Sequence, residues 1–124
     1  HLYNWGEPTL NKELTKMISY SSECGIWSRI STNLSLKFND SYLDGLVKSG
    51  LSLLHIDIDG LDQDVYEKYR KKGDLKTVLN NLKKVVNFKE KYKARCCAQS
   101  NKTACAGKFQ KKYGNDGHRC SSNV

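Results

Sequence analysis

The stretch Leu51-Ser52-Leu53-Leu54-His55-Ile56-Asp57-Ile58-Asp59-Gly60 decides how this chain folds. Apolar and polar residues alternate along it with a period of two, which is typical of a β-strand with two different faces. The apolar face suits covering helices, and the polar face suits a barrel interior or a cleft. The sequence therefore predicts a strand over residues 51–58 whose polar face lines a site. The two faces consist of Leu54, Ile56 and Ile58 on one side and of His55, Asp57 and Asp59 on the other.

Two further motifs precede this stretch at almost even intervals, Asn4-Trp5-Gly6-Glu7-Pro8 and Ile30-Ser31-Thr32-Asn33. Each of the three motifs closes a short apolar run and precedes a segment with helical periodicity. Their spacing of about 25 residues matches one strand-plus-helix unit. We therefore predict an α/β fold of about three βα units in series, with a parallel sheet. Because parallel strands end at one rim of a sheet, one ligand could touch all three motifs.

Helical periodicity separates and follows the predicted strands. We expect a first helix that starts near residue 10 and stops at Gly25, helices over residues 40–50 and 62–70, and a longer one that begins at a cap on Asp74. Apolar residues recur in each at the spacing of one helix face. The first helix is expected to bury Leu10, Leu14, Met17 and Ile18.

The length and the charge distribution limit the domain organisation. The 124 residues suffice for one domain, but a complete (βα)6 or (βα)8 barrel needs roughly 150–250. The net charge of +8 is uneven, because residues 1–82 hold 10 basic and 11 acidic side chains and residues 83–124 hold 11 and 2. Large apolar residues also become scarce after residue 92. We predict a partial core domain over residues 1–92 and a basic, cysteine-containing tail over residues 93–124 that is disordered or frameshifted.

Composition also restricts the partners. No apolar run approaches the roughly 18–20 residues of a transmembrane helix and no signal peptide is visible, so we expect a cytoplasmic protein without a membrane partner. The basic tail lacks an aromatic platform, so it predicts only non-specific attraction to nucleic acid or anionic lipid. The tail cysteines lack the paired spacing of zinc modules and are predicted to be free thiols. They are Cys96, Cys97, Cys105 and Cys120.

The first two motifs carry candidate binding residues. Gly6 lets a ligand approach the backbone closely, and Glu7, which precedes Pro8, could accept hydrogen bonds from a cationic amino group. Ser31-Thr32-Asn33 offers hydroxyls and an amide for ribose or carboxylate contacts. The alternatives are an ordinary βα turn and a polar loop that approaches a helix.

The third motif and the helix after it carry charged residues with several possible roles. His55, Asp57 and Asp59 could line a site, ligate a divalent metal or form inert salt bridges. Same-face residues of a strand lie about 7 Å apart, so all three reach one metal only if the strand bends. Arg70 ends a charged run and is either a solvated residue or a clamp for a carboxylate.

Taken in order, these motifs resemble the radical S-adenosylmethionine (SAM) superfamily, above all its members with SPASM or twitch extensions. The resemblance covers residues 2–92. It implies the second to fourth βα units of a partial, TIM-type (βα)6 barrel, with SAM as a cofactor. The residues that carry it are Asn4-Trp5-Gly6-Glu7-Pro8-x-Leu10-Asn11, Ile30-Ser31-Thr32-Asn33 and Asp57-Ile58-Asp59-Gly60-x5-Tyr66-x3-Arg70-x2-Gly73.

The resemblance implies a role for each candidate residue. Gly6-Glu7-Pro8 matches a Gly-Gly-Glu-Pro-like turn that contacts the SAM amino group, with a tryptophan in place of the first glycine. Residues 31–33 match a polar strand end near the cofactor. Asp57 stands where the family usually has a serine that contacts SAM, and a carboxylate there could accept ribose hydroxyls; Asp59 belongs to the same motif. Arg70 matches a position that often pairs with the SAM carboxylate.

The family's defining Cys-x3-Cys-x2-Cys motif is missing from this sequence. In the family, a [4Fe-4S] cluster held by that motif reduces SAM, and the resulting 5′-deoxyadenosyl radical abstracts a hydrogen from the substrate. We therefore expect a fragment of a radical SAM enzyme that is inactive by itself and holds no catalytic residue. Its intact parent would encode the motif upstream of His1 and act on a substrate such as a peptide.

Two other functions fit the residues. The chain could be a non-catalytic half-barrel remnant whose basic tail binds anionic partners, which predicts salt-sensitive polyanion binding that is lost without residues 93–124. It could also be an unrelated α/β metal-dependent hydrolase that uses His55, Asp57 and Asp59. That function predicts thermal stabilisation by a divalent metal that is lost in Asp57→Ala.

Overall fold

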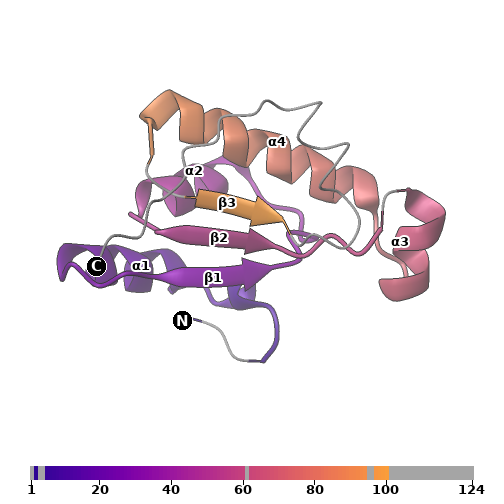
Figure 1. Cartoon of the computed structure of the whole chain (residues 1–124), viewed down its shortest axis with the longest axis horizontal. Coiled ribbons are helices and arrows are strands. Elements are labelled where there is room, and N and C mark those ends of the chain that lie inside the picture. Colours follow the sequence, from indigo (N-terminus) through magenta and orange to yellow (C-terminus); the bar gives the residue numbers. More distant parts are fainter. Residues whose placement is uncertain (1, 3–4, 61, 95–96, 101–124) are drawn as a thin grey trace.

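The computed structural model describes residue 2 and residues 5–60, 62–94 and 97–100 of the chain. Helices and parallel strands alternate along it (Figure 1). In chain order the elements are the 3-10 helix η1 (Pro8–Leu10), α1 (Leu14–Glu23), β1 (Arg29–Thr32), α2 (Asp40–Lys48), β2 (Leu53–Ile56), α3 (Gln63–Tyr69), α4 (Leu75–Tyr92) and β3 (Cys97–Ser100).

The three strands form one parallel sheet in the order β1-β2-β3. Arg29 pairs with Leu53 and Thr32 with Ile56, and Leu53 in turn pairs with Cys97. Each connection between neighbouring strands contains helices, as parallel pairing requires. The prediction of a parallel α/β fold is therefore confirmed, whereas the (βα)6 barrel stays an expectation beyond this three-stranded sheet. Of the strand expected before the first motif, only Leu2 is described, and Asn4 lies outside the described residues.

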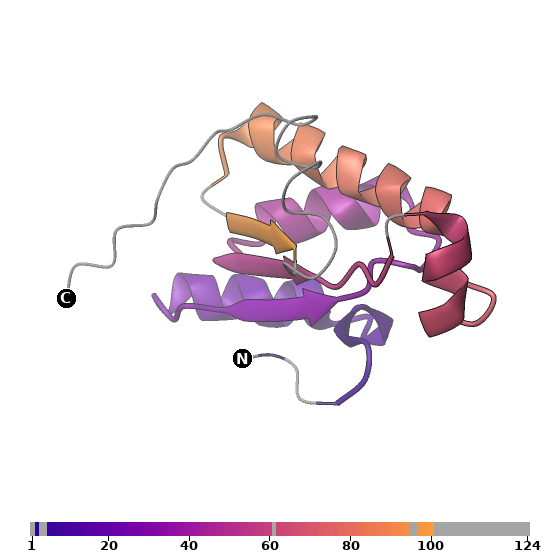
Figure 2. The same ribbon diagram turned by 45° about the vertical axis from the view of Figure 1, so that its right-hand side comes forward.

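Helices α1, α2 and α4 cover the apolar face of the sheet (Figures 1 and 2). One core contains Ile18 of α1, Leu46 of α2 and Val78 of α4 together with Leu54 and Ile56 of β2. Burial alternates along β2 as predicted, with residues 54, 56 and 58 buried and residues 55, 57 and 59 partly exposed. As far as the described elements go, the polar face is left to line a site.

Side-chain caps start the later helices. Asn39 Oδ1 accepts the backbone N–H of Tyr42 at the start of α2, and Asp62 Oδ1 accepts that of Val65 at the start of α3. The predicted cap of α4 is confirmed, because Asp74 Oδ1 accepts the backbone N–H two residues later at 3.0 Å. These bonds satisfy N–H groups that have no partner inside the helix. Among the described residues, no helix combines the length and the apolarity needed to cross a bilayer.

The first helix begins later than the sequence predicts. Leu10 belongs to η1 and is 67% exposed, Met17 is 43% exposed, and only Leu14 and Ile18 of the expected face are buried. Asn11 separates the two helices, since its Oδ1 accepts the backbone N–H of residue 13 instead of continuing the turn. Such local side-chain bonds compete with helix propagation.

The chain after α4 forms a strand that the sequence analysis does not predict. Tyr92 ends α4, at the predicted domain boundary, and Cys97–Ser100 then pairs with β2. The expectation of a disordered tail is wrong for these four residues, because main-chain hydrogen bonds to a neighbouring strand do not require a hydrophobic side-chain pattern. Residues 95–96 and 101–124, with Cys96, Cys105 and Cys120, lie outside the described part.

Candidate functional site

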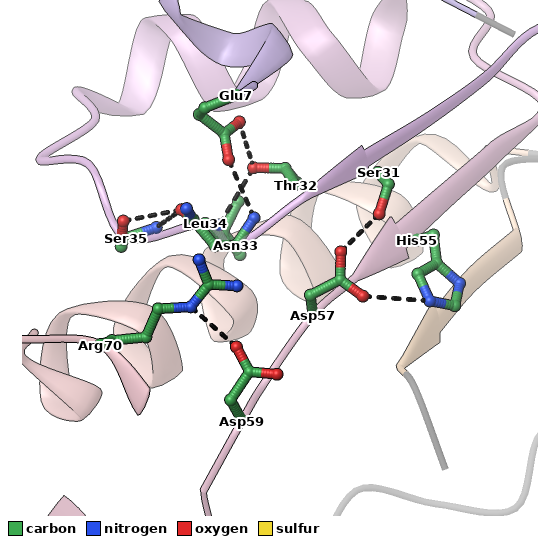
Figure 3. Close-up of polar contacts among 10 residues, drawn as sticks. All are labelled: Glu7, Ser31, Thr32, Asn33, Leu34, Ser35, His55, Asp57, Asp59 and Arg70. Carbon is green, nitrogen blue, oxygen red and sulfur yellow. Dashed lines mark hydrogen bonds and ion pairs between the residues drawn. The ribbon is translucent and has the colours of Figure 1, made fainter. Parts of the chain in front are cut away.

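A cleft of about 400 Å³ lies at the carboxyl ends of β1 and β2 (Figure 3). The polar residues of all three sequence motifs meet there, which agrees with the position of ligand sites in parallel α/β sheets. Pro8 and Asp59 were also predicted site residues, but neither lines the cleft. The lining consists of Gly6, Glu7, Ser31, Thr32, Asn33, Asp57 and Arg70.

The Glu7 carboxylate joins the first loop to the end of β1. Its Oε1 accepts hydrogen bonds from Thr9 N at 3.1 Å, Thr9 Oγ1 at 2.5 Å and Thr32 Oγ1 at 2.6 Å. Among the described residues, its Oε2 accepts only the backbone N–H of Asn33, at 3.0 Å. Each carboxylate oxygen has two lone-pair sites, so Oε2, with one donor, keeps room for one further donor even though Oε1 is crowded by three. Gly6 beside it has φ +90°, a conformation that side chains rarely adopt.

Side chains at the end of β1 form hydrogen bonds with the loop that follows this strand. The Thr32 hydroxyl also accepts the backbone N–H of Leu34 at 3.0 Å, so its donor and one acceptor site are used internally. Asn33 Oδ1 accepts both the backbone N–H and the hydroxyl of Ser35, at 3.0 and 2.7 Å. The Asn33 amide nitrogen has no partner among the described residues. Thr32 therefore supports the site, while Asn33 offers two free donors to a ligand.

Asp57 connects the two strands on the polar face. Its Oδ2 accepts the Ser31 hydroxyl at 2.5 Å, and its Oδ1 lies 3.3 Å from His55 Nε2. Asp59 does not join this cluster but pairs with Arg70, on the other side of the cleft (Figure 3). No three His, Cys, Asp or Glu side chains gather as a metal site in the described part of the chain. Of the three side chains that could have shared a metal, His55 and Asp57 lie together, whereas Asp59 pairs with Arg70 and does not gather with them.

A hydrogen bond to Asp59 fixes the orientation of the Arg70 side chain. Arg70 Nε donates to Asp59 Oδ2 at 2.7 Å, and Figure 3 shows the two terminal nitrogens on the side of Asn33. These nitrogens have no partner among the described residues. An arginine held in this way presents a planar pair of donors, the geometry that binds a carboxylate with two hydrogen bonds.

The sequence analysis gave no packing role to Gly60 and Gly73, and it missed Asn81, which holds the loop after β1. A Cβ on Gly60 would lie 2.5 Å from the backbone N of Tyr66, and one on Gly73 would lie 2.6 Å from its ring, so both glycines permit close packing around α3. The buried Asn81 of α4 donates to the carbonyls of Leu34 and Leu36 at 3.0 and 2.8 Å. The sequence signal for this contact was Asn81 itself, a polar residue within the apolar stripe of α4.

The fold and the cleft define the chain as part of a parallel α/β domain with a polar cleft at the strand ends, where such domains commonly have their sites. Residues 3–94 match the model of the Radical SAM superfamily, and the chain belongs to this superfamily. The predicted family is thus confirmed. The chain is also 30% identical over 86 residues to a protein described as "Probable GTP 3′,8-cyclase" from Methanocaldococcus jannaschii. The match covers 66% of this chain and 27% of that protein, so the chain spans about a quarter of its length.

The superfamily uses SAM and a [4Fe-4S] cluster, and the described residues fit these two groups differently. The cleft offers an acceptor site on Glu7, free donors on Arg70 and Asn33, and the Asp57 carboxylate, which together suit the polar groups of SAM. The cluster needs several thiolates. In the described part, Cys24 is exposed and belongs to no group of three possible ligands. These residues therefore do not fit the cluster.

Proposed function

We propose that the cleft is the SAM-binding part of a radical SAM enzyme. The observation that carries this proposal is that an arginine with two free terminal nitrogens and a glutamate with one free acceptor site line the same cleft. SAM ends in an amino acid, so it carries both a carboxylate and an ammonium group. Arg70 is placed to bind the carboxylate, and Glu7 Oε2 is placed to accept the ammonium.

The remaining lining residues suit the nucleoside. Asp57 accepts ribose hydroxyls, and the Ser31 hydroxyl holds it by donating to Oδ2. The Asn33 amide donates to the cofactor from the end of β1. In the superfamily, bound SAM supplies the hydrogen-abstracting chemistry, and these residues bind and orient it.

The reaction of the intact protein is part of the proposal. A guanine nucleotide, the substrate class in the relative's name, is the first candidate substrate. A peptide substrate, SPASM or twitch membership and a cytoplasmic location stay predictions.

Isothermal titration of the full chain with SAM tests the proposal. Arg70→Lys keeps the charge but loses the planar pair of donors, so SAM affinity should fall about tenfold, which corresponds to about 1.4 kcal/mol. Arg29→Lys is the matched control, because Arg29 begins β1 at the end away from the cleft. 5′-Methylthioadenosine, which lacks the amino acid, should bind both variants equally. Equal SAM affinities of the two variants would contradict the assignment.

A further inference from the structure

A second cavity, of about 620 Å³, lies beside the cleft. The loop after β1, the end of α3 and the start of α4 surround it. Arg70 lines both cavities, so the two adjoin at this side chain. The volume is within the range of small-molecule sites. The residues used below are Lys37, Lys68, Lys71, Lys72 and Tyr66, all of which line the second cavity.

The second cavity has an excess of positive charge. Its four lysines come from two separate segments, and none has an acidic partner within the described residues. By contrast, Lys16, Lys48 and Lys84 each lie 2.7 Å from a carboxylate. One carboxylate, Asp74, lines the cavity, and it already accepts hydrogen bonds from the first turn of α4. A cavity whose lining has a net excess of positive charge attracts anions.

A buried donor in the wall of this cavity also has no partner. Tyr66 is fully buried, and its hydroxyl has no hydrogen-bond partner among the described residues. Burial raises the pKa of this hydroxyl, so it stays protonated and can donate at neutral pH. Buried polar groups are rarely left unpaired, because the lost hydration is not replaced. Tyr66 lines the cavity, so an acceptor bound there would satisfy its hydroxyl once the atoms that cover the hydroxyl move aside.

We propose that the second cavity binds the phosphate group of a small molecule. The lysines supply charge, and Tyr66 supplies a directed hydrogen bond to a phosphate oxygen. A phosphate group carries more negative charge and more acceptor oxygens than a carboxylate, which suits four unpaired ammonium groups and one hydroxyl. The proposal stands on this cavity alone and does not depend on SAM binding.

NMR titration of the ¹⁵N-labelled full chain tests the proposal by following the backbone amides of residues 68–77. Inorganic phosphate and phenyl phosphate are the two probes, and benzoate is the carboxylate control. Both phosphates should shift these amides with saturation, and benzoate should bind at least tenfold more weakly. Tighter binding of phenyl phosphate identifies a phosphate ester as the ligand, and equal binding identifies free phosphate. Benzoate binding as tight as phenyl phosphate would overturn the proposal.

Two variants separate the site from general charge attraction. Lys71→Gln with Lys72→Gln should weaken phosphate binding about tenfold. Lys76→Gln with Lys83→Gln removes the same charge from exposed lysines of α4 that do not line the cavity, and it should leave affinity within about twofold. Equal losses in the two double variants would show non-specific attraction and overturn the proposal.

Tyr66→Phe gives the sharpest result, because it removes no charge and no existing hydrogen bond. We expect phosphate affinity to fall about fivefold while the unfolding temperature stays the same or rises. Unchanged affinity in a folded Tyr66→Phe variant would show that the hydroxyl does not face a ligand. If this variant is unfolded, Lys72→Gly replaces it as the test. Lys72 has φ +60°, which glycine adopts without strain, so this variant should fold while it removes a charge from the cavity. Lys72→Gly should raise the unfolding temperature by about 4 °C and still weaken phosphate binding.

Discussion

Replacing Glu7 by glutamine tests whether one carboxylate holds the first loop against the sheet. The carboxylate accepts four hydrogen bonds, and two of them come from the end of β1, more than 20 positions away in sequence. Glutamine has nearly the same shape but offers one acceptor oxygen and one NH₂ group. With the oxygen at Oε1, the NH₂ group faces the backbone N–H of Asn33, and two donors then oppose each other.

The expected cost follows from these contacts. The unmet Asn33 N–H costs about 1–2 kcal/mol at this partly buried site, and loss of the charge weakens the three remaining bonds by about 1 kcal/mol together. We therefore expect Glu7→Gln to lower the free energy of unfolding by about 2–3 kcal/mol. With the urea dependence usual for small domains, the unfolding midpoint should move down by about 1 M.

Urea unfolding followed by circular dichroism measures this change. Glu13→Gln is the matched control, because Glu13 is exposed and, within the described part of the chain, its side chain pairs only with Lys16 at the start of α1. That surface pair contributes at most about 1 kcal/mol. If Glu7→Gln and Glu13→Gln unfold at the same urea concentration, the Glu7 carboxylate does not hold the loop. These hydrogen bonds then do not position Oε2 for a ligand.

Three further substitutions test the supports of the site. Asn81→Leu removes one hydrogen bond from each of two loop carbonyls, of which, among the described residues, only that of Leu36 keeps another donor, the backbone N–H of Phe38; it should cost about 2 kcal/mol in urea unfolding, with faster hydrogen exchange in the loop after β1, and unchanged exchange would contradict this role. Gly60→Ala places a methyl group against the Tyr66 backbone and should cost about 1–3 kcal/mol, whereas Gly45→Ala, in open space on α2, should stabilise by about 0.5–1 kcal/mol; similar effects in both would refute the packing argument. A hydrogen bond from a threonine hydroxyl lowers the pKa of Asp74 below its ordinary value of 3.8, so its stabilising contribution is complete above that pH and is lost as pH falls through the folded-state pKa. Acid titration should therefore show Asp74→Asn less stable than the parent at pH 6, with a difference that shrinks below pH 3.8.

Local patterns predicted the elements but not all of their ends. The two-residue alternation over residues 51–58 identified both faces of β2, and the cap on Asp74 marked the start of α4. The first helix began later than predicted because Asn11 bonds to its own neighbours, a choice between two local structures that periodicity does not decide. Strand β3 was missed because its pairing depends on the position of β2 and not on a pattern of its own.

The same distinction applies to the cleft. The sequence by itself predicted that three polar motifs each follow a strand of a βα unit, and from this that their residues meet at one rim of a parallel sheet; the cleft lined by residues of all three motifs agrees with that. Only the tertiary structure decided which side chains remain free there. Thr9, Thr32 and Asn33 donate to the Glu7 carboxylate and leave one acceptor site on Oε2. Asp59 pairs with Arg70 and does not join His55 and Asp57. The physical reason is that strand periodicity assigns a face to each residue locally, whereas a hydrogen-bond partner more than 20 residues away depends on strand register and loop position, which form only when the chain packs.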